Sequence, residues 1–284
     1  MLRDKIRNII FVIIYFTGIH LIYRWFFQKN QVTILLFHEV AAPYSKKIFN
    51  YLNKKYNIIS LRDYVESILN EKDNFYKIKN KLIITFDDGH KSNYDMFNKI
   101  KAMNIPITIF LTTGIIGTKN GFWWNNNFSN MKNEELKKIS DDARINILKK
   151  YGFDQKNELS LREALSDEEI FEMKDTIDFQ SHSVSHPILV ECDENKARNE
   201  IEGSKLYLEK HFNIDVFAFA YPNGDWNKRE QRLAIEADYK CILTTIHGYN
   251  NDKSDLFSLK RISAGTGRSY FETIIKSTGI RLKK

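Results

Sequence analysis

The chain has 284 residues, of which 43% are apolar and only four are proline. This length and composition suit one large domain, and no Gly/Ser-rich stretch or internal repeat indicates a linker or a repeat protein. The net charge is +7, but residues 1–30 hold five Lys or Arg and one Asp, which leaves only +3 on the rest. So small a surplus gives no support to nucleic-acid binding. The two cysteines, Cys192 and Cys241, cannot make a disulfide framework; one bridge and two free thiols are both open.

The first element in chain order is an apolar segment within residues 9–27, which follows three basic residues. A basic flank before an apolar run is typical of a signal anchor, and no small-x-small cleavage site follows. The run is shorter than the roughly 20 residues that span a bilayer, and His20 and Arg24 interrupt it. A helix in the membrane interface and a helix packed on the domain are the alternatives. We expect residues 1–30 to form a membrane-anchoring or membrane-surface helix.

A strand-then-helix rhythm follows through residues 31–284. Ser60 and Ser166 begin two of the helical patterns as N-caps. The alternation predicts an α/β fold, an incomplete, distorted (β/α) barrel with about seven parallel strands. The connection from about 115 to 175 is long, holds two helical patterns, and is interpreted as a helical insertion. The predicted strands are Val32–Phe37, Lys81–Phe86, Ile107–Leu111, Ile177–Gln180, Val216–Ala220, Lys240–Thr244 and Phe257–Ile262.

Two adjacent acids, Asp87 and Asp88, stand directly behind the second predicted strand and before Gly89. Neighbouring side chains in a strand point to opposite faces, but a glycine at the strand end lets both acids turn into one pocket. Two carboxylates in one pocket repel each other unless a cation neutralises them or one binds a proton. The pair therefore indicates a metal ligand beside a base, although a lone Asp-Asp pair is also common in solvated turns.

Two histidines, His182 and His186, follow the fourth predicted strand at a spacing of four residues. Two imidazoles and one carboxylate make a three-ligand divalent metal site with an open position for water. His38, Asp87, His182 and Tyr221 each follow a different predicted strand, so all lie at the carboxyl ends, where such barrels gather their active sites. Two histidines and one carboxylate also describe non-haem iron oxygenases, but those do not need the second acid.

A third motif, Phe-Ala-Phe-Ala-Tyr-Pro-Asn-Gly at residues 217–224, is an apolar strand that ends in a turn. In order and approximate spacing, the three motifs resemble those of the polysaccharide deacetylases, the NodB-homology group of carbohydrate esterase family four. The resemblance covers roughly residues 31–275. Further matches are the segments 37–40, 123–124, 243–245 and 260–262.

The resemblance implies a metal-dependent hydrolase that removes N-acetyl groups from amino sugars. Asp88, His182 and His186 would bind a divalent ion, with zinc expected, and Asp87 would be the base that takes a proton from water. A backbone N–H near Asn223 would stabilise the oxyanion. Acetate and a free amino sugar would be the products.

Two positions depart from the pattern of the family. An arginine that often orients the catalytic aspartate is replaced by Ala220; Arg261 is the expected substitute, and a surface ion pair is its alternative. The late histidine that often protonates the leaving amine is matched poorly by His247. We therefore prefer His38 as general acid, with a structural role as its alternative. His20, His90 and His211 are predicted to be non-catalytic.

The predicted substrate contacts are Tyr221, Pro222, Trp123, Trp124 and His247. The tryptophan pair would form a sugar-stacking wall, or alternatively a buried aromatic pair within the insertion. The predicted partners are an acetylated amino-sugar polysaccharide or a lipid-linked glycan of bacterial type, and a membrane, with the extracytoplasmic side favoured. The competing functions are an amidase of the same barrel for a non-sugar amide and a degenerate, non-catalytic sugar-binding protein.

Overall fold

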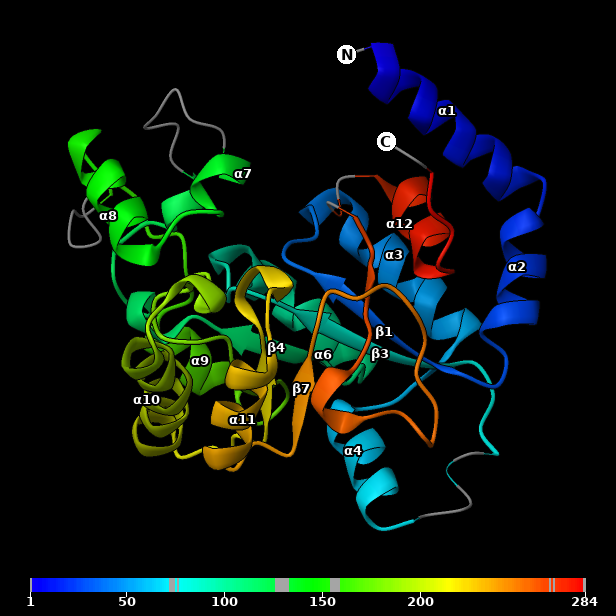
Figure 1. Ribbon diagram of the computed structural model, residues 1–284. Helices are drawn as coiled ribbons and strands as arrows, with labels where there is room; N and C mark the ends of the chain where they lie inside the picture. Colours follow the sequence, from blue (N-terminus) through cyan, green and yellow to red (C-terminus); the bar gives the residue numbers. More distant parts are fainter. Residues whose placement is uncertain are drawn as a thin grey trace.

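A curved sheet of parallel strands forms the centre of the protein (Figure 1). The computed structural model describes residues 2–71, 75, 77–125, 133–153, 159–265, 267 and 269–282. Seven strands follow one another in the order β7-β6-β5-β4-β3-β1-β8, and a short β2 pairs with β3. The strands are β1 (Val32–Phe37), β2 (Asn57–Ile58), β3 (Lys81–Phe86), β4 (Thr108–Leu111), β5 (Asp178–Ser181), β6 (Ala218–Ala220), β7 (Cys241–Leu243) and β8 (Ile262–Ser263).

The central strands are buried on both faces, as their unbroken apolar sequences predict. All six residues of β1 and all six of β3 are buried. Successive side chains divide between two cores. Ile34 packs with Ile83 and Phe110 inside the curve of the sheet, whereas Leu35 and Ile84 pack beneath the surrounding helices.

Helices cover the outside of the sheet (Figure 1). Two N-caps were correctly predicted: Ser60 accepts from the backbone of Asp63, and Ser166 forms a complete capping box with Glu169. Beyond the N-terminal pair described below, the α-helices are α3 (Ala42–Lys55), α4 (Leu61–Leu69), α6 (Phe97–Met103), α7 (Asn133–Leu136), α8 (Asp141–Lys150), α9 (Asp167–Met173), α10 (Glu194–Phe212), α11 (Lys228–Glu236) and α12 (Tyr270–Ser277). The 3₁₀ helices are η1 (Lys91–Met96), η2 (Thr113–Ile115), η3 (Trp123–Asn125), η4 (Leu189–Glu191), η5 (Pro222–Gly224) and η6 (Leu256–Ser258).

The predicted incomplete barrel is confirmed, with two differences at its edges. The last predicted strand begins as the 3₁₀ helix η6, and only its final residue, Ile262, belongs to β8, which pairs with β1. Leu259, which precedes β8, forms a parallel bridge with Leu243 of β7. The segment before β8 thus links the two edges of the sheet. The two-residue β2 has no apolar run and was not predicted.

The segment between β4 and β5 carries η2, η3, α7, α8 and α9. Its own small core packs Trp123 with Leu136, Leu148 and Phe153. Residues 126–132 and 154–158 of this segment lie outside the described part of the chain. Both cysteines, whose state the sequence left open, are buried free thiols.

The expected single N-terminal helix is wrong, because the segment forms two helices: α1 (Leu2–Phe16) and α2 (Ile19–Phe27). They meet at Gly18, whose φ of 72° belongs to the left-handed region, and the bend between them is 74°. Within the described residues no one helix has the length and apolarity to cross a bilayer; only this bent pair, taken together, does.

Candidate active site

The two acids at the end of β3 are held in different directions. The backbone N–H of Asp87 donates to Phe37 O at 2.9 Å, which continues the pairing of β3 with β1. Asp88 and Gly89 then have φ values of 72° and 73°. A Cβ at Gly89 would lie 2.6 Å from the Leu111 side chain, so glycine is required there. The resulting turn lets Asp87 and Asp88 face different partners.

The two histidines flank a tight turn after β5. Ser183 and His186 both have positive φ, at 68° and 56°. Ser183 Oγ accepts from the backbone N–H of His186 at 3.0 Å. Non-glycine residues in this region cost free energy and persist where their surroundings hold them, often at functional sites.

Glu200 of α10 fixes this turn, and the sequence analysis missed it. Its carboxylate accepts from the backbone of Val184 at 2.9 Å, the backbone of Ser185 at 2.7 Å and Ser185 Oγ at 2.6 Å. A signal was present, because Glu200 falls on the buried face of α10 with Ala197 and Ser204, where an acid needs a specific partner.

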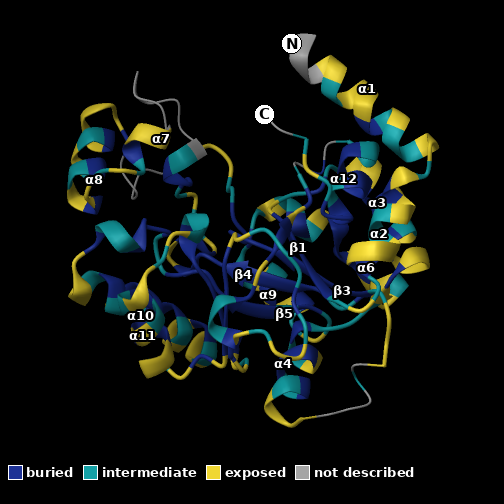
Figure 2. Cartoon of the chain, turned by 45° about the vertical axis from the view of Figure 1, so that its right-hand side comes forward, coloured by how far each residue is buried: buried dark blue, intermediate teal, exposed yellow. Residues whose placement is uncertain are grey.

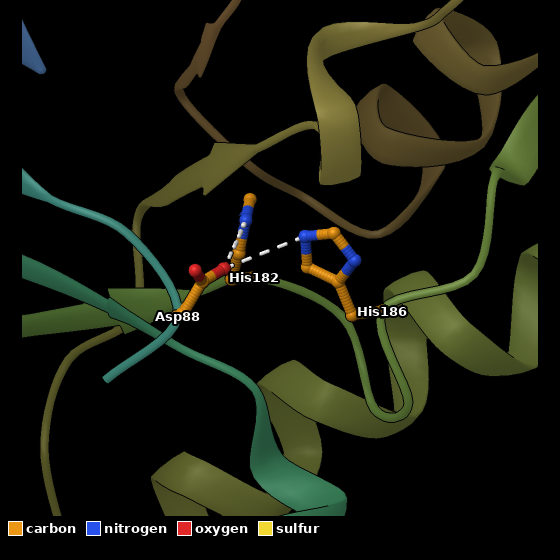
Figure 3. A group of neighbouring side chains, drawn as sticks. All are labelled: Asp88, His182 and His186. Atoms are coloured by element: carbon orange, nitrogen blue, oxygen red, sulfur yellow. Dashed lines mark ion pairs between the residues drawn. The ribbon is translucent and has the colours of Figure 1, made fainter. Parts of the chain in front are cut away.

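Asp88, His182 and His186 converge on one point (Figure 3). Asp88 Oδ1 lies 3.4 Å from Nε2 of each histidine, and the three ligand atoms lie within 4.8 Å of one another. Two atoms about 2.0–2.1 Å from a tetrahedral ion lie roughly 3.3 Å apart. Asp88 Oδ1 is buried and has no hydrogen-bond partner among the described residues. The donor set therefore fits a divalent metal ion.

The protonation states of Asp88 and His186 suit metal binding. Burial would raise the pKa of Asp88, but the adjacent imidazoles of His182 and His90 outweigh burial and hold that pKa well below its usual value. Burial, together with the neighbouring His182, lowers the pKa of His186 to about 3, so this imidazole is neutral at pH 7. His182 Nδ1 donates to Ala220 O at 2.7 Å, which leaves its Nε2 directed at Asp88.

Asp87 is held by Arg261, which precedes β8 and is 1% exposed. The guanidinium donates to both carboxylate oxygens, at 2.7 and 2.8 Å, and its Nε donates to Thr244 O at 2.8 Å. Burial would raise the pKa of Asp87, but the charge and hydrogen bonds of Arg261, together with the nearby His182, outweigh burial, and the pKa lies below its usual value. Arg261 thus contacts the acid that an arginine at the position of Ala220 often orients in other members of the family.

The acids and histidines lie in a cavity of about 350 Å³. His38 is at its exposed rim, with Nε2 4.0 Å from Asp88 Oδ2. Asn223 also lines it and has a φ of 57°. The remaining lining residues are Leu36, Trp123, Trp124, Glu134, Lys137, Tyr221, Gly224 and Thr245.

The two tryptophans occupy one wall of the cavity in different ways. Trp123 is 4% exposed, its Nε1 donates to His186 O at 3.0 Å, and it packs in the small core of the insertion. The ring of Trp124 lies 4.0 Å from that of His186. Trp123 thus belongs to a buried aromatic cluster, as one of the two alternatives predicted, and Trp124 lines the cavity beside His186.

Two predicted substrate contacts are not among the lining residues. Pro222 is buried in η5. His247 Nε2 donates to Gly279 O at 3.1 Å, and its side chain lines a second cavity. Because His247 follows β7, it was predicted to contact the substrate. The loop instead turns toward the C-terminal segment, so His247 lies outside the cavity that holds the acids and histidines.

His90 was predicted to be non-catalytic, but it contacts the metal-site acid. Its Nε2 donates to Asp88 Oδ2 at 3.2 Å and leaves Oδ1 facing the two histidines. Burial lowers the pKa of His90, but the hydrogen bond to Asp88 and the negative charges of Asp88 and Glu39 together outweigh burial and raise the pKa overall. The signal in the sequence was its position two residues after Asp88.

The sequence profile of the polysaccharide deacetylases matches residues 76–242, a span that includes the acid and histidine motifs. The chain belongs to the polysaccharide deacetylase family. The enzymes of this family depend on a metal ion, and the buried Asp88, His182 and His186 fit that requirement. Among curated protein sequences, none matches the chain significantly.

Several solved structures share the fold. The Streptococcus pyogenes deacetylase PplD in complex with acetate aligns with a TM-score of 0.64 at 20% identity, over 88% of this chain and 99% of that one. IcaB from Ammonifex degensii aligns with a TM-score of 0.65 at 15% identity, over 89% and 99%. The polysaccharide deacetylase BC0361 from Bacillus cereus gives 0.61 at 18% identity, over 88% and 69%.

Proposed function

We propose that this protein removes N-acetyl groups from the amino sugars of a bacterial-type surface or cell-wall polysaccharide. The observation that carries the proposal is that the two adjacent acids, Asp87 and Asp88, have different partners. Asp88 faces two imidazoles, while Asp87, 4.0 Å from His182, is clamped by Arg261 beside an open cavity.

Zinc is the proposed metal, held by Asp88, His182 and His186. When bound, a zinc ion polarises the amide carbonyl and lowers the pKa of water to about 7. Its charge complements the buried oxygen of Asp88 that has no hydrogen-bond partner among the described residues.

The chain's own residues perform the proton transfers. Asp87, ionised and oriented by Arg261, takes a proton from the water that attacks the carbonyl carbon. A backbone N–H near Asn223 donates to the oxyanion. His38 gives a proton to the amide nitrogen as the carbon–nitrogen bond breaks, so that acetate and a free amine leave.

The proposed substrate contacts are Trp123, Trp124, Tyr221 and Pro222. Aromatic faces suit the apolar faces of sugar rings, and Trp124 is the more accessible of the two tryptophans. The ring of Tyr221 is stacked on Trp226 at 5.7 Å, which holds the tyrosine in place at the base of the cavity.

The proposed domain division is a membrane-associated segment at residues 1–30 and a catalytic domain at residues 31–284, with the insertion at about 115–175. The segment would contact the membrane through residues 9–27, and the domain would work on the extracytoplasmic side. A polysaccharide or a lipid-linked glycan is the proposed substrate.

Acetate release from a panel of acetylated glycans tests the proposal. The full-length protein should release acetate, lose this activity with chelator, and regain it when zinc is added back. Asp87→Asn should be inactive while it still binds zinc. Release from simple amides but not from acetamido sugars would favour the amidase, and sugar binding without acetate release would favour a degenerate binding protein.

A further inference from the structure

The N-terminal helices expose an unusual amount of apolar surface. In the described part of the chain 21 large apolar side chains are exposed, and 11 of them lie between Ile6 and Phe27. Phe16 is 74% exposed and Phe26 is 68% exposed. Figure 2 shows exposed positions along both α1 and α2. Contiguous exposed apolar surface of this kind marks a protein or membrane contact.

The inner side of these helices is held by polar contacts and by aromatic packing of Tyr15 on Tyr270 and Phe271. Tyr15 hydroxyl lies 3.1 Å from that of Tyr270 on α12. His20 Nε2 lies 3.0 Å from Tyr51 hydroxyl, and Gln28 donates to Thr33 Oγ1 at 2.9 Å. A helix of a soluble domain normally turns its apolar stripe inward. Here many apolar side chains point outward, although Phe11 is buried.

The positive charge of the N-terminal segment favours an anionic membrane over an apolar protein as its partner. Lys5, Arg7, Arg24 and Lys29 lie on this segment, and no Asp or Glu occurs between Lys5 and Lys29. Lys29 also lies over the ring of Trp25 at 4.7 Å. Basic residues beside exposed aromatic and aliphatic side chains are typical of helices that lie on anionic lipid.

A second cavity, of about 430 Å³, adjoins α1 and the C-terminal segment. Arg7, Lys276 and Arg281 line it together with the apolar Phe11 and Ile280. Lys276 is paired with Glu272 at 2.7 Å, and Arg281 adds a second cationic side chain from the C-terminal segment. A cavity with cationic and apolar walls is chemically suited to a phosphate group that carries an acyl chain.

The second cavity is separated from the catalytic cavity by very little chain. Thr245 lines the catalytic cavity, and His247 lines the second one. Two residues span at most about 7 Å. Arg261, which holds Asp87, is likewise followed directly by Ile262 of the second cavity. The linings of the two cavities are therefore close neighbours along the chain, from Thr245 to His247 and from Arg261 to Ile262.

We propose that α1 and α2 lie on the surface of an anionic bilayer and that the second cavity binds a phosphate-bearing lipid headgroup beside the active site. This inference rests on the membrane association proposed above and specifies its geometry and its lipid. The 15 residues of α1 and the nine of α2 reach about 22 Å and 14 Å, each less than the roughly 30 Å hydrocarbon core. The 74° bend suits helices that follow the surface of a curved domain.

Flotation of the full-length protein with vesicles tests the inference. We expect binding to phosphatidylcholine vesicles that contain phosphatidylglycerol, and weaker binding to phosphatidylcholine alone. Replacing Ile9, Ile13 and Phe16 by serine should lower binding at least about tenfold. The matched control replaces the similarly exposed Leu161 and Leu206 by serine and should bind as the wild type does.

The cavity is tested separately with Arg281→Glu. Reversing one charge at the membrane surface should weaken binding to anionic vesicles roughly 30-fold and leave binding to neutral vesicles unchanged. Lys149→Glu on α8, with the same change of net charge, should have little effect. Equal effects of the two variants would overturn the headgroup site while leaving membrane association intact.

Two further outcomes contradict the inference. Release of the protein from vesicles by inorganic phosphate at constant ionic strength would assign the second cavity to a free anion. A stable dimer in sedimentation, with no vesicle binding, would assign the exposed faces of α1 and α2 to a second copy of the chain. Acetate release in solution is a separate measurement, so either result leaves the proposed deacetylation open to its own test.

Discussion

The metal-ligand site and the N-terminal helix pair both depart from the usual rule that charged side chains are exposed and apolar ones are buried, but in opposite ways. At the site, ionisable groups are buried: Asp88 is 3% exposed and His182 is 1% exposed. On α1 and α2, large apolar groups are exposed, such as Phe16 and Phe26. Both arrangements cost free energy in water. The proposals above assign each arrangement a partner from outside the chain, a cation in one region and a lipid surface in the other.

Asp88→Ala should have the largest effect, because it removes the acid from the three-ligand set. Bound zinc and acetate release should both fall to background. In the wild type, chelation should lower the midpoint of thermal unfolding, whereas it should not change that of the variant. Asp95→Ala, on the same segment and exposed, is the control. If Asp88→Ala still bound zinc at full occupancy, Asp88 would not be a metal ligand.

Asp87→Asn should separate catalysis from metal binding. Turnover should fall about 10²–10⁴-fold, as expected for loss of a general base, with zinc content unchanged. The free energy of unfolding should fall by about 3–5 kcal/mol, because the buried Arg261 loses its counter-charge. Urea unfolding measures this, with the exposed Asp225→Asn as control. Unchanged turnover would exclude Asp87 as the base.

Glu200→Gln should loosen the turn that presents the histidines. An amide cannot accept all the hydrogen bonds that Glu200 receives from Val184 and Ser185. Zinc affinity should fall about 10–100-fold, measured by competition with a chelator. Glu202→Gln, two residues along α10 and paired with Arg198, should leave it unchanged. The same loss in both variants would indicate a general effect on α10.

Acid should destabilise the zinc-free protein. The pKa values of Asp87 and Asp88 lie below their ordinary value of 3.8, so the folded form binds fewer protons there than the unfolded chain. Their contribution to stability is complete above pH 3.8 and is lost as the pH falls through the folded pKa values. Urea midpoints measured across this range should decline less in Asp87→Asn combined with Arg261→Met. Parallel declines would contradict the assignment.

Phe26→Ser should change stability least. Its side chain is largely exposed, so the free energy of unfolding should change by about 0.5 kcal/mol or less. Vesicle binding should nevertheless weaken. A large loss of stability, measured by urea unfolding, would mean that Phe26 belongs to the core, and the comparison between the two regions would fail.

The site residues that lie in short motifs at strand ends were the ones most readily predicted from the sequence. Asp87, Asp88 and His182 could be placed because parallel strands bring their carboxyl ends to one edge. Arg261 could be suggested only as a substitute, since its contact with Asp87 spans 174 residues of chain. Glu200 and His90 were missed because their roles depend on how α10 and the turn after β3 pack.

The errors have equally local causes. The N-terminal segment was predicted to be one helix because most of its residues are apolar, but Gly18 adopts the left-handed conformation and separates two helices. His247 was placed with the substrate from its position after β7, but a loop's direction is decided by tertiary contacts such as that with Gly279.

The bond between Arg261 and Asp87 also bears on synthesis of the protein. If the chain folded during synthesis before residue 261 was made, Asp87 would be buried without the positive charge of Arg261. Such an intermediate is disfavoured and cannot set the geometry of the base. Maturation of the enzyme is thereby tied to arrival of its last strand, and truncated translation products are expected to be inactive.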